Sequence, residues 1–163
     1  MNRKEYNSVV KSLSHRLYAF LLKNCKNEAL VNDLMQDTFE KLWVNRKSVE
    51  VEKARQWLFT TGYRLMLNTI KRNQKTELRE SISETAFFER KPNLIEQKDF
   101  IDHILSLLTE QQRAIILLRD YEGYDYQEIG NILSLSESQV KVYLFRARKK
   151  LKEQLKKNKH LVA

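Results

Sequence analysis

Glycine and proline are scarce in this chain, which has three glycines and one proline among its 163 residues. A many-stranded sandwich or barrel needs such residues at its frequent turns, so their scarcity argues against an all-β fold. With 42% apolar residues, a chain of this length can bury one medium core or two small ones. We therefore predict an all-α protein.

Cysteine and histidine are equally rare. The single cysteine, Cys25, excludes an internal disulfide, and we interpret it as an inert structural thiol rather than a redox sensor. The three histidines lie far apart and show no metal-ligand spacing with Cys25. We therefore predict no metal site, no cofactor and no catalytic constellation.

Long apolar runs are also missing. None approaches the roughly 20 residues that cross a bilayer, and residues 1–22 lack the apolar core and cleavage site of a signal peptide. We expect a cytoplasmic protein without membrane insertion. Its formal charge of +9 favours a polyanionic partner, with nucleic acid ahead of a membrane surface.

Apolar residues at helical spacing predict three helices in the first half of the chain. The first covers about residues 6–21, the second 28–45 and the third 54–73. The second has an apolar side and an acidic side. Between the second and third helices, the polar segment 45–54 is predicted to be a loop. The three helices could share one core.

Helical periodicity weakens in residues 77–98, which contain the only proline among charges of both signs. We predict a linker there, in which Phe87 and Phe88 could form a short docked helix. The domain boundary therefore falls in this segment, between small helical domains over 1–76 and 99–163.

Capping signals divide the second domain into short helices. In each signal a Thr, Asp or Ser is followed three residues later by Glu or Gln, so that side chains satisfy the free backbone amides of a helix start. The pairs are Thr109 with Gln112, Asp125 with Glu128, and Ser136 with Gln139. Together with the amphipathic segment 99–108, they predict a four-helix unit.

The last two of these helices have helix-turn-helix spacing. One ends near Leu133, a turn of about four residues follows, and the other starts after Ser136. An apolar stripe on the second helix is expected to face the core. Its members are Val140, Leu144, Ala147, Leu151 and Leu155.

The neighbouring face of this last helix is basic. Residues 141–159 hold nine bases and one acid, whereas residues 99–137 hold two bases and eight acids. Phe145 lies outside the core stripe, where it could contact a thymine methyl or a sugar, and Lys141 and Arg146 could reach phosphates or purine edges. We predict DNA contact by the first two turns and only a solvated charged face further on.

Two blocks of the sequence, in this order, resemble the extracytoplasmic-function (ECF) group of the sigma-70 family. The first is DLMQDTFEKLW, followed by a polar loop and RQWLFTTGYRLMLNTIKR; the second is LTEQQRAIILLRDYEGYDYQEIGNILSLSESQVKVYLFRARKKL. The resemblance covers about residues 5–156. It implies an alternative sigma factor that has no catalytic activity. The implied partners are core RNA polymerase, through the clamp and flap of its large subunits, and promoter DNA; many relatives also bind an anti-sigma factor.

The resemblance also implies roles for particular residues in the first domain, which corresponds to sigma region 2. The positions that match the clamp-binding block are Asp33, Gln36, Asp37 and Glu40. Candidates for contact with the −10 element are Lys47, Ser48, Lys53, Arg64, Lys71 and Arg72. From the pattern alone, the acidic face fits a solvated surface equally well.

Two aromatic residues in the third helix affect this assignment. Trp57 matches an aromatic that stacks on a melted base in the family, although we interpret it as a core residue first. Tyr63 and Arg64 stand where the family has a basic residue and an asparagine. This departure leaves the detail of −10 recognition open.

In the second domain, which corresponds to sigma region 4, the resemblance agrees with the helical-face argument. The candidate −35 contacts are Ser138, Gln139, Lys141, Val142, Phe145, Arg146 and Lys149. The alternative function is a helix-turn-helix regulator that uses the same module without binding polymerase, and an acidic face that binds no clamp would favour it.

Overall fold

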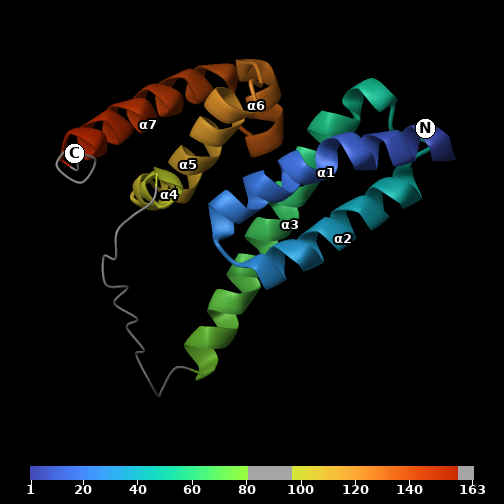
Figure 1. Cartoon of the computed structure of the whole chain (residues 1–163), viewed down its shortest axis with the longest axis horizontal. Coiled ribbons are helices and arrows are strands. Elements are labelled where there is room, and N and C mark those ends of the chain that lie inside the picture. Colours follow the sequence, from blue (N-terminus) through green and yellow to red (C-terminus); the bar gives the residue numbers. More distant parts are fainter. Residues whose placement is uncertain (81–96, 158–163) are drawn as a thin grey trace.

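The computed structural model describes residues 1–80 and 97–157, and within these ranges it consists of helices and short turns without a strand (Figure 1). The all-α prediction with two helical units is confirmed. The N-terminal unit contains α1 (Arg3–Cys25), α2 (Glu28–Asn45) and α3 (Val51–Glu80). The C-terminal unit contains α4 (Gln97–Ser106), α5 (Glu110–Ile116), the π-helical turn η1 (Leu117–Tyr121), α6 (Tyr126–Leu133) and α7 (Glu137–Lys157).

Local capping sets the ends of the first two helices. Asn2 and Glu5 form a capping box at the start of α1, and Lys26 ends this helix in the left-handed conformation. The next residue, Asn27, accepts a hydrogen bond from the Leu30 amide at 3.1 Å. Because stop and start signals are adjacent here, α2 has the predicted bounds.

The three N-terminal helices share one apolar core. Each contributes a stripe, and full burial of one large apolar side chain contributes about 1.5–3 kcal/mol. Packing of these stripes therefore holds the helices together more than intrinsic propensity does. The fully buried side chains at the centre include Leu17, Leu21, Leu42, Leu58, Phe59 and Met66.

The predicted loop over 45–54 is wrong in its second half, because α3 begins at Val51. Val49 and Ala54 are both buried, so the turn packs against the core and α3 begins three residues before the predicted start at residue 54. Lys53 and Glu50 add an ion pair of 3.2 Å across this first turn.

The other end of α3 also lies beyond its predicted position. The segment 74–80 continues the helix because Gln, Lys, Glu, Leu and Arg are good helix formers even without an apolar stripe. The prediction of a docked helix at Phe87 and Phe88 lies outside the described residues.

All three capping boxes predicted for the C-terminal unit are present. In each, the N-cap side chain accepts from the amide three residues later, and the Glu or Gln side chain there accepts from the N-cap amide. The starts of α5, α6 and α7 are thereby confirmed.

The helix-turn-helix depends on a close backbone approach at Gly130. The turn begins at Ser134, whose φ of 59° is left-handed, and the Leu135 amide donates to the Gly130 carbonyl at 2.9 Å. A Cβ atom on Gly130 would lie 2.6 Å from the Leu135 carbonyl oxygen. Only glycine therefore fits this position without moving the turn.

The apolar stripe of α7 is buried only over its first half. Val140, Leu144 and Ala147 are buried, Leu151 is half-buried, and Leu155 is 39% exposed. The prediction that Leu155 faces the core is wrong. The reason is length, because the 21 residues of α7 extend about 32 Å and pass the short helices on which it packs.

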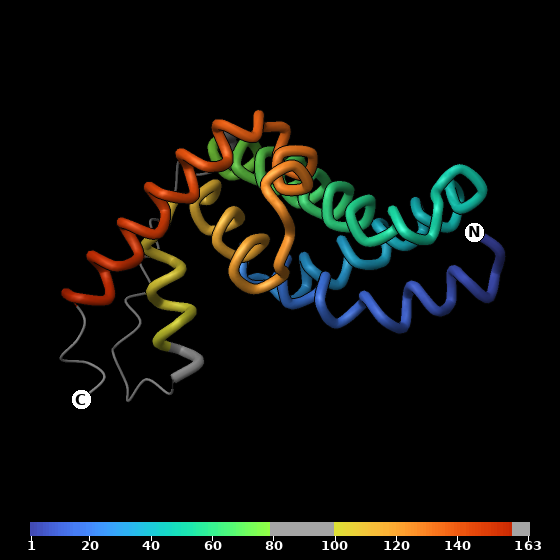
Figure 2. The backbone as a smooth tube through the Cα atoms, turned by 90° about the horizontal axis from the view of Figure 1, so that it is seen from above, coloured from blue at the N-terminus to red at the C-terminus, as the bar shows by residue number. Residues whose placement is uncertain are grey.

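The two units pack directly against one another. Figure 2 shows the C-terminal unit alongside α1 and α3, and the contact is made mainly by α6 on α3 and by α5 on α1. The buried apolar residues of the two units form one continuous cluster.

We expect Gly130→Ala to destabilise the protein by about 1–3 kcal/mol, because the added methyl group forces the Leu135 carbonyl out of the turn. Chemical denaturation followed by circular dichroism measures this change. The matched control is Gln127→Ala, an exposed residue on the same helix. Equal stability of the two variants would contradict the close approach.

Candidate nucleic-acid interface

The acidic residues predicted on the second helix form one exposed face of α2. Asp33, Gln36, Asp37 and Glu40 are all exposed, opposite the buried side of the helix. Within the described part of the chain, none of the three carboxylates forms an ion pair. The face therefore has unpaired negative charge available for a basic partner.

This face continues into two apolar residues that the sequence analysis missed. Val44 follows Glu40 by four residues and is 71% exposed, and Trp43 is partly exposed beside it. The ring of Trp43 packs edge-on against Tyr6 at 4.9 Å and lies under the Arg46 guanidinium at 3.9 Å. An exposed valine at i+4 from the acidic residues was the available sequence signal.

Two of the predicted −10 residues, Lys53 and Arg64, line an open groove along α3. Trp57 also lines the groove, and Asn131 of α6 lines it from the other unit. Trp57 is half-buried, so it packs on the core and still presents part of its ring to the groove. The remaining lining residues are Gln56, Thr60 and Thr61.

The other four predicted −10 residues lie outside this groove. Lys47 and Ser48 are in the turn before α3, where the Ser48 hydroxyl donates to the Asn45 carbonyl at 2.9 Å. Lys71 and Arg72 are exposed further along α3. The structure therefore spreads the predicted set over the turn and the length of α3.

Tyr63 is a core residue. It is buried, its ring lies 6.1 Å from that of Phe20, and burial raises the pKa of its hydroxyl. Only its neighbour Arg64 reaches the surface. At this pair the structure therefore has a core aromatic residue followed by an exposed arginine that lines the groove.

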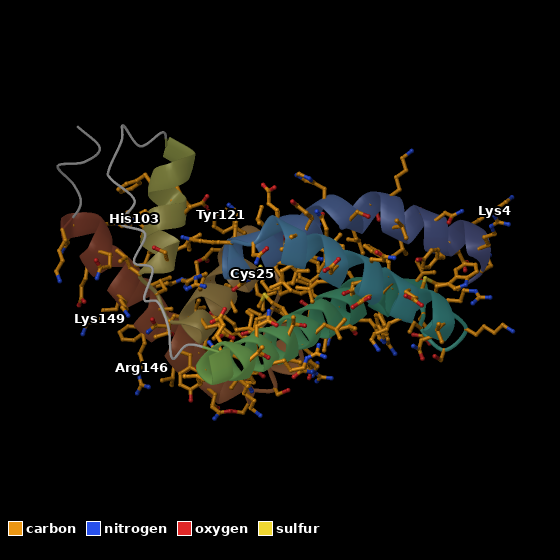
Figure 3. The ribbon with its side chains drawn as sticks, turned by 90° about the horizontal axis from the view of Figure 1, so that it is seen from below. Lys4, Cys25, His103, Tyr121, Arg146 and Lys149 are labelled. Carbon is orange, nitrogen blue, oxygen red and sulfur yellow. The ribbon has the colours of Figure 1, made fainter. Side chains whose placement is uncertain are left out.

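All seven predicted −35 residues are exposed on α7. Phe145 is 70% exposed, and Val142 is exposed on the same side. Arg146 and Lys149 project outward from α7 in Figure 3. This part of α7 thus combines an apolar centre with basic neighbours, which suits the major groove.

Local contacts restrain two of these residues. The Gln139 side chain accepts from the Ser136 amide in the capping box at 2.9 Å. Lys141 lies 3.7 Å from a Glu137 carboxylate oxygen and 5.7 Å from the centre of the Tyr126 ring. Their freedom to reach DNA is therefore smaller than that of Arg146 or Lys149.

Arg148 has a different role from the neighbouring Arg146. Its guanidinium binds Asp120 at the end of the α5 and η1 segment, with a shortest distance of 2.6 Å. This hydrogen bond is the main cause that raises the pKa of Arg148. Arg148 therefore fastens α7 to its own unit, whereas Arg146 has no such partner among the described residues.

Other kinds of site find no support in the described residues. No group of three or more His, Cys, Asp or Glu side chains there could hold a metal ion. Burial raises the pKa of the Cys25 thiol, which disfavours the reactive thiolate. Within the same residues, no helix combines the length and the apolarity that a membrane crossing requires.

Comparison with known protein families gives two matches. The family model described as sigma-70 region 2 matches residues 9–76, and the one described as sigma-70 region 4 matches residues 101–151. These segments contain the α2 and α3 candidates and the α7 candidates, respectively.

Similar proteins of known type include two from Bacillus subtilis (strain 168). The ECF RNA polymerase sigma factor SigM is 28% identical over 141 residues, which cover 83% of this chain and 86% of SigM. The RNA polymerase sigma factor YlaC is 28% identical over 148 residues, which cover 86% of each chain.

Two solved structures share the fold. The sigma factor RpoE from Bartonella quintana, in complex with the anti-sigma factor NepR, has a TM-score of 0.75 and 26% identity over 94% of this chain and 98% of that one. CnrH, in complex with the cytosolic domain of CnrY, has a TM-score of 0.70 over 96% and 91%; at 23% identity it supports the fold alone.

We expect Arg148→Ala to lower the free energy of unfolding by up to about 1 kcal/mol, because it removes a partly exposed ion pair with Asp120. Arg146→Ala is the matched control and should leave stability unchanged. Urea denaturation of both variants measures the difference. Equal loss of stability in both would contradict the division of roles between these arginines.

Proposed function

Because the chain belongs to the ECF group of the sigma-70 family, it is an alternative sigma factor that directs transcription initiation, and we propose that α2, α3 and α7 carry its contacts. We assign residues 1–76 to sigma region 2, 99–163 to sigma region 4 and 77–98 to the connecting linker. The observation that carries the proposal is a pair of oppositely charged exposed faces: α2 has acids, and α7 has the bases Arg146 and Lys149, that form no ion pair among the described residues. One face suits a basic protein partner and the other suits DNA.

The acidic face of α2 binds the clamp of core RNA polymerase. Asp33, Asp37 and Glu40 can meet basic residues without first breaking an internal ion pair. The apolar end of this face, at Trp43 and Val44, adds area that loses water on binding.

The groove along α3 receives the melted strand of the −10 element. Its half-buried Trp57 offers part of a ring for stacking, and Lys53 and Arg64 supply positive charge for the backbone. Lys71 and Arg72 extend this charge along the helix, and Lys47 and Ser48 add polar groups at its start.

The exposed face of α7 enters the major groove at the −35 element. Phe145 and Val142 provide apolar contacts suited to thymine methyl groups, while Arg146 reads a base edge and Lys149 contacts phosphate. Ser138 and Gln139 lie at the start of the helix, where recognition helices approach base edges, and Lys141 is beside them.

The protein acts by binding in the cytoplasm, where its polymerase partner works, and needs no catalytic residue or cofactor of its own. An anti-sigma factor is a further candidate partner, because the similar sigma factor RpoE was solved with NepR.

We expect Asp37→Arg to weaken binding to core RNA polymerase by more than about tenfold, because it places a cation against the basic clamp surface. Glu77→Arg makes the same charge change at an exposed position of α3 and should bind like the wild type. Fluorescence anisotropy with labelled protein measures both affinities. If Asp37→Arg binds core polymerase as the wild type does, α2 is not the clamp interface.

We expect Arg146→Ala to reduce discrimination for the −35 element by about 1–3 kcal/mol, because it removes a base-edge contact. The measurement compares the affinity of holoenzyme for promoter DNA with that for DNA carrying a mutated −35 element. Lys149→Ala is the control, and should weaken binding to both DNAs equally. An equal loss on both DNAs for Arg146→Ala would instead make Arg146 a phosphate contact.

A further inference from the structure

One residue of the C-terminal unit joins it to two helices of the N-terminal unit. Glu122 follows η1, and its carboxylate lies 2.8 Å from Arg16 of α1 and 3.8 Å from Arg55 of α3. Its backbone carbonyl also accepts hydrogen bonds from both guanidinium groups. The side chain is only 11% exposed, so the two arginines must offset the free-energy cost of burying its negative charge.

An aromatic contact reinforces this ion cluster. Tyr124 is buried against α3, where its ring meets Phe59 edge-on at 5.4 Å. The Arg55 guanidinium lies 4.2 Å from the centre of the same ring. Arg55 is therefore held between an anion and an aromatic face, both supplied by the other unit.

A second set of polar contacts joins the end of α1 to α4, α5 and η1. Arg113 donates to the Asn24 carbonyl at 2.7 Å, while its other nitrogens donate within its own unit. Lys23 lies 3.9 Å from an Asp102 carboxylate oxygen and 5.3 Å from the centre of the Tyr121 ring. The contact between the units is therefore extensive and mainly polar at its edges.

This docking brings the two proposed DNA-binding surfaces close together. Asn131 of α6 lines the groove that contains Lys53 and Arg64, and its neighbour Gly130 packs against Val140 at the start of α7. Phe145 follows Val140 by about 7.5 Å of helix rise. The −35 face therefore begins within about 20 Å of the −10 groove, given usual helix separations.

A promoter requires a much larger separation. Elements centred near −10 and −35 are about 25 base pairs apart, which is roughly 85 Å of straight duplex at 3.4 Å per base pair. The docked arrangement cannot span this distance, so the units must separate before both elements are bound.

We propose that the Glu122 cluster is a latch that keeps the free protein closed and that binding to core RNA polymerase must open. The inference rests on the proposed function, because it supposes that polymerase holds the two units apart on promoter DNA. The closed state reduces the apparent affinity for polymerase by the fraction of molecules that are open. Weakening the latch therefore strengthens binding to polymerase, although Glu122 is not part of the α2 face that is proposed to contact the clamp.

The test uses the full-length chain with Glu122→Gln, which removes the charge and keeps the shape, and with Arg55→Ala from the opposite side of the contact. Glu153→Ala, an exposed acid on α7, is the matched control. Small-angle X-ray scattering measures the radius of gyration of each free variant, circular dichroism checks its helix content, and anisotropy measures its affinity for core polymerase.

Both latch variants should have a larger radius of gyration than the wild type, unchanged helix content and up to about tenfold tighter polymerase binding. The control should match the wild type in all three measurements. Unchanged scattering by both variants, or opening without tighter binding, would overturn the latch. If the wild-type protein does not bind polymerase, the proposed function fails, while scattering still decides whether Glu122 holds the units together.

Discussion

The arrangement of the whole molecule depends on the Glu122 carboxylate between Arg16 and Arg55. A carboxylate with so little exposure is costly unless it is paired, and removing a partner from a buried pair can cost about 3–5 kcal/mol. Both arginines remain partly exposed, so the cost here is lower and their charges can regain water. The cluster is therefore strong enough to orient two units and weak enough to release them. Separating the units also exposes part of the apolar cluster that they share, including the contact between Phe59 and Tyr124, and this adds to the cost of opening.

The distribution of charge explains how one small chain can serve two kinds of partner. Among the residues that the structure describes, the acids of α2 and the bases Arg146 and Lys149 of α7 form no ion pair. Two other bases of α7, Arg148 and Lys141, form ion pairs with Asp120 and Glu137, respectively. Ion pairs within the chain therefore decide which basic residues are available to bind DNA. The total charge of +9 does not show which residues these are.

Helix positions and capping could be predicted well because their causes are local. Thr109, Asp125 and Ser136 each act on an amide three residues away, and α2 was delimited by its apolar spacing. Errors arose where distant packing or helix length decided the outcome. The start of α3 follows from the burial of Val49 and Ala54. Leu155 is exposed because α7 extends beyond the helices on which it packs.

The sequence by itself determined the all-α class, the helix-turn-helix and which residues of α2 and α7 stand on exposed faces, since periodicity and capping act within one or two turns of a helix. Only the tertiary structure decided that Trp57 and Asn131 line one groove, and that Glu122 meets Arg16 and Arg55. These partners are 106 and 67 residues apart. No local sequence pattern predicts that one carboxylate pairs with two arginines at such separations. The pairing follows from how the two units pack against one another.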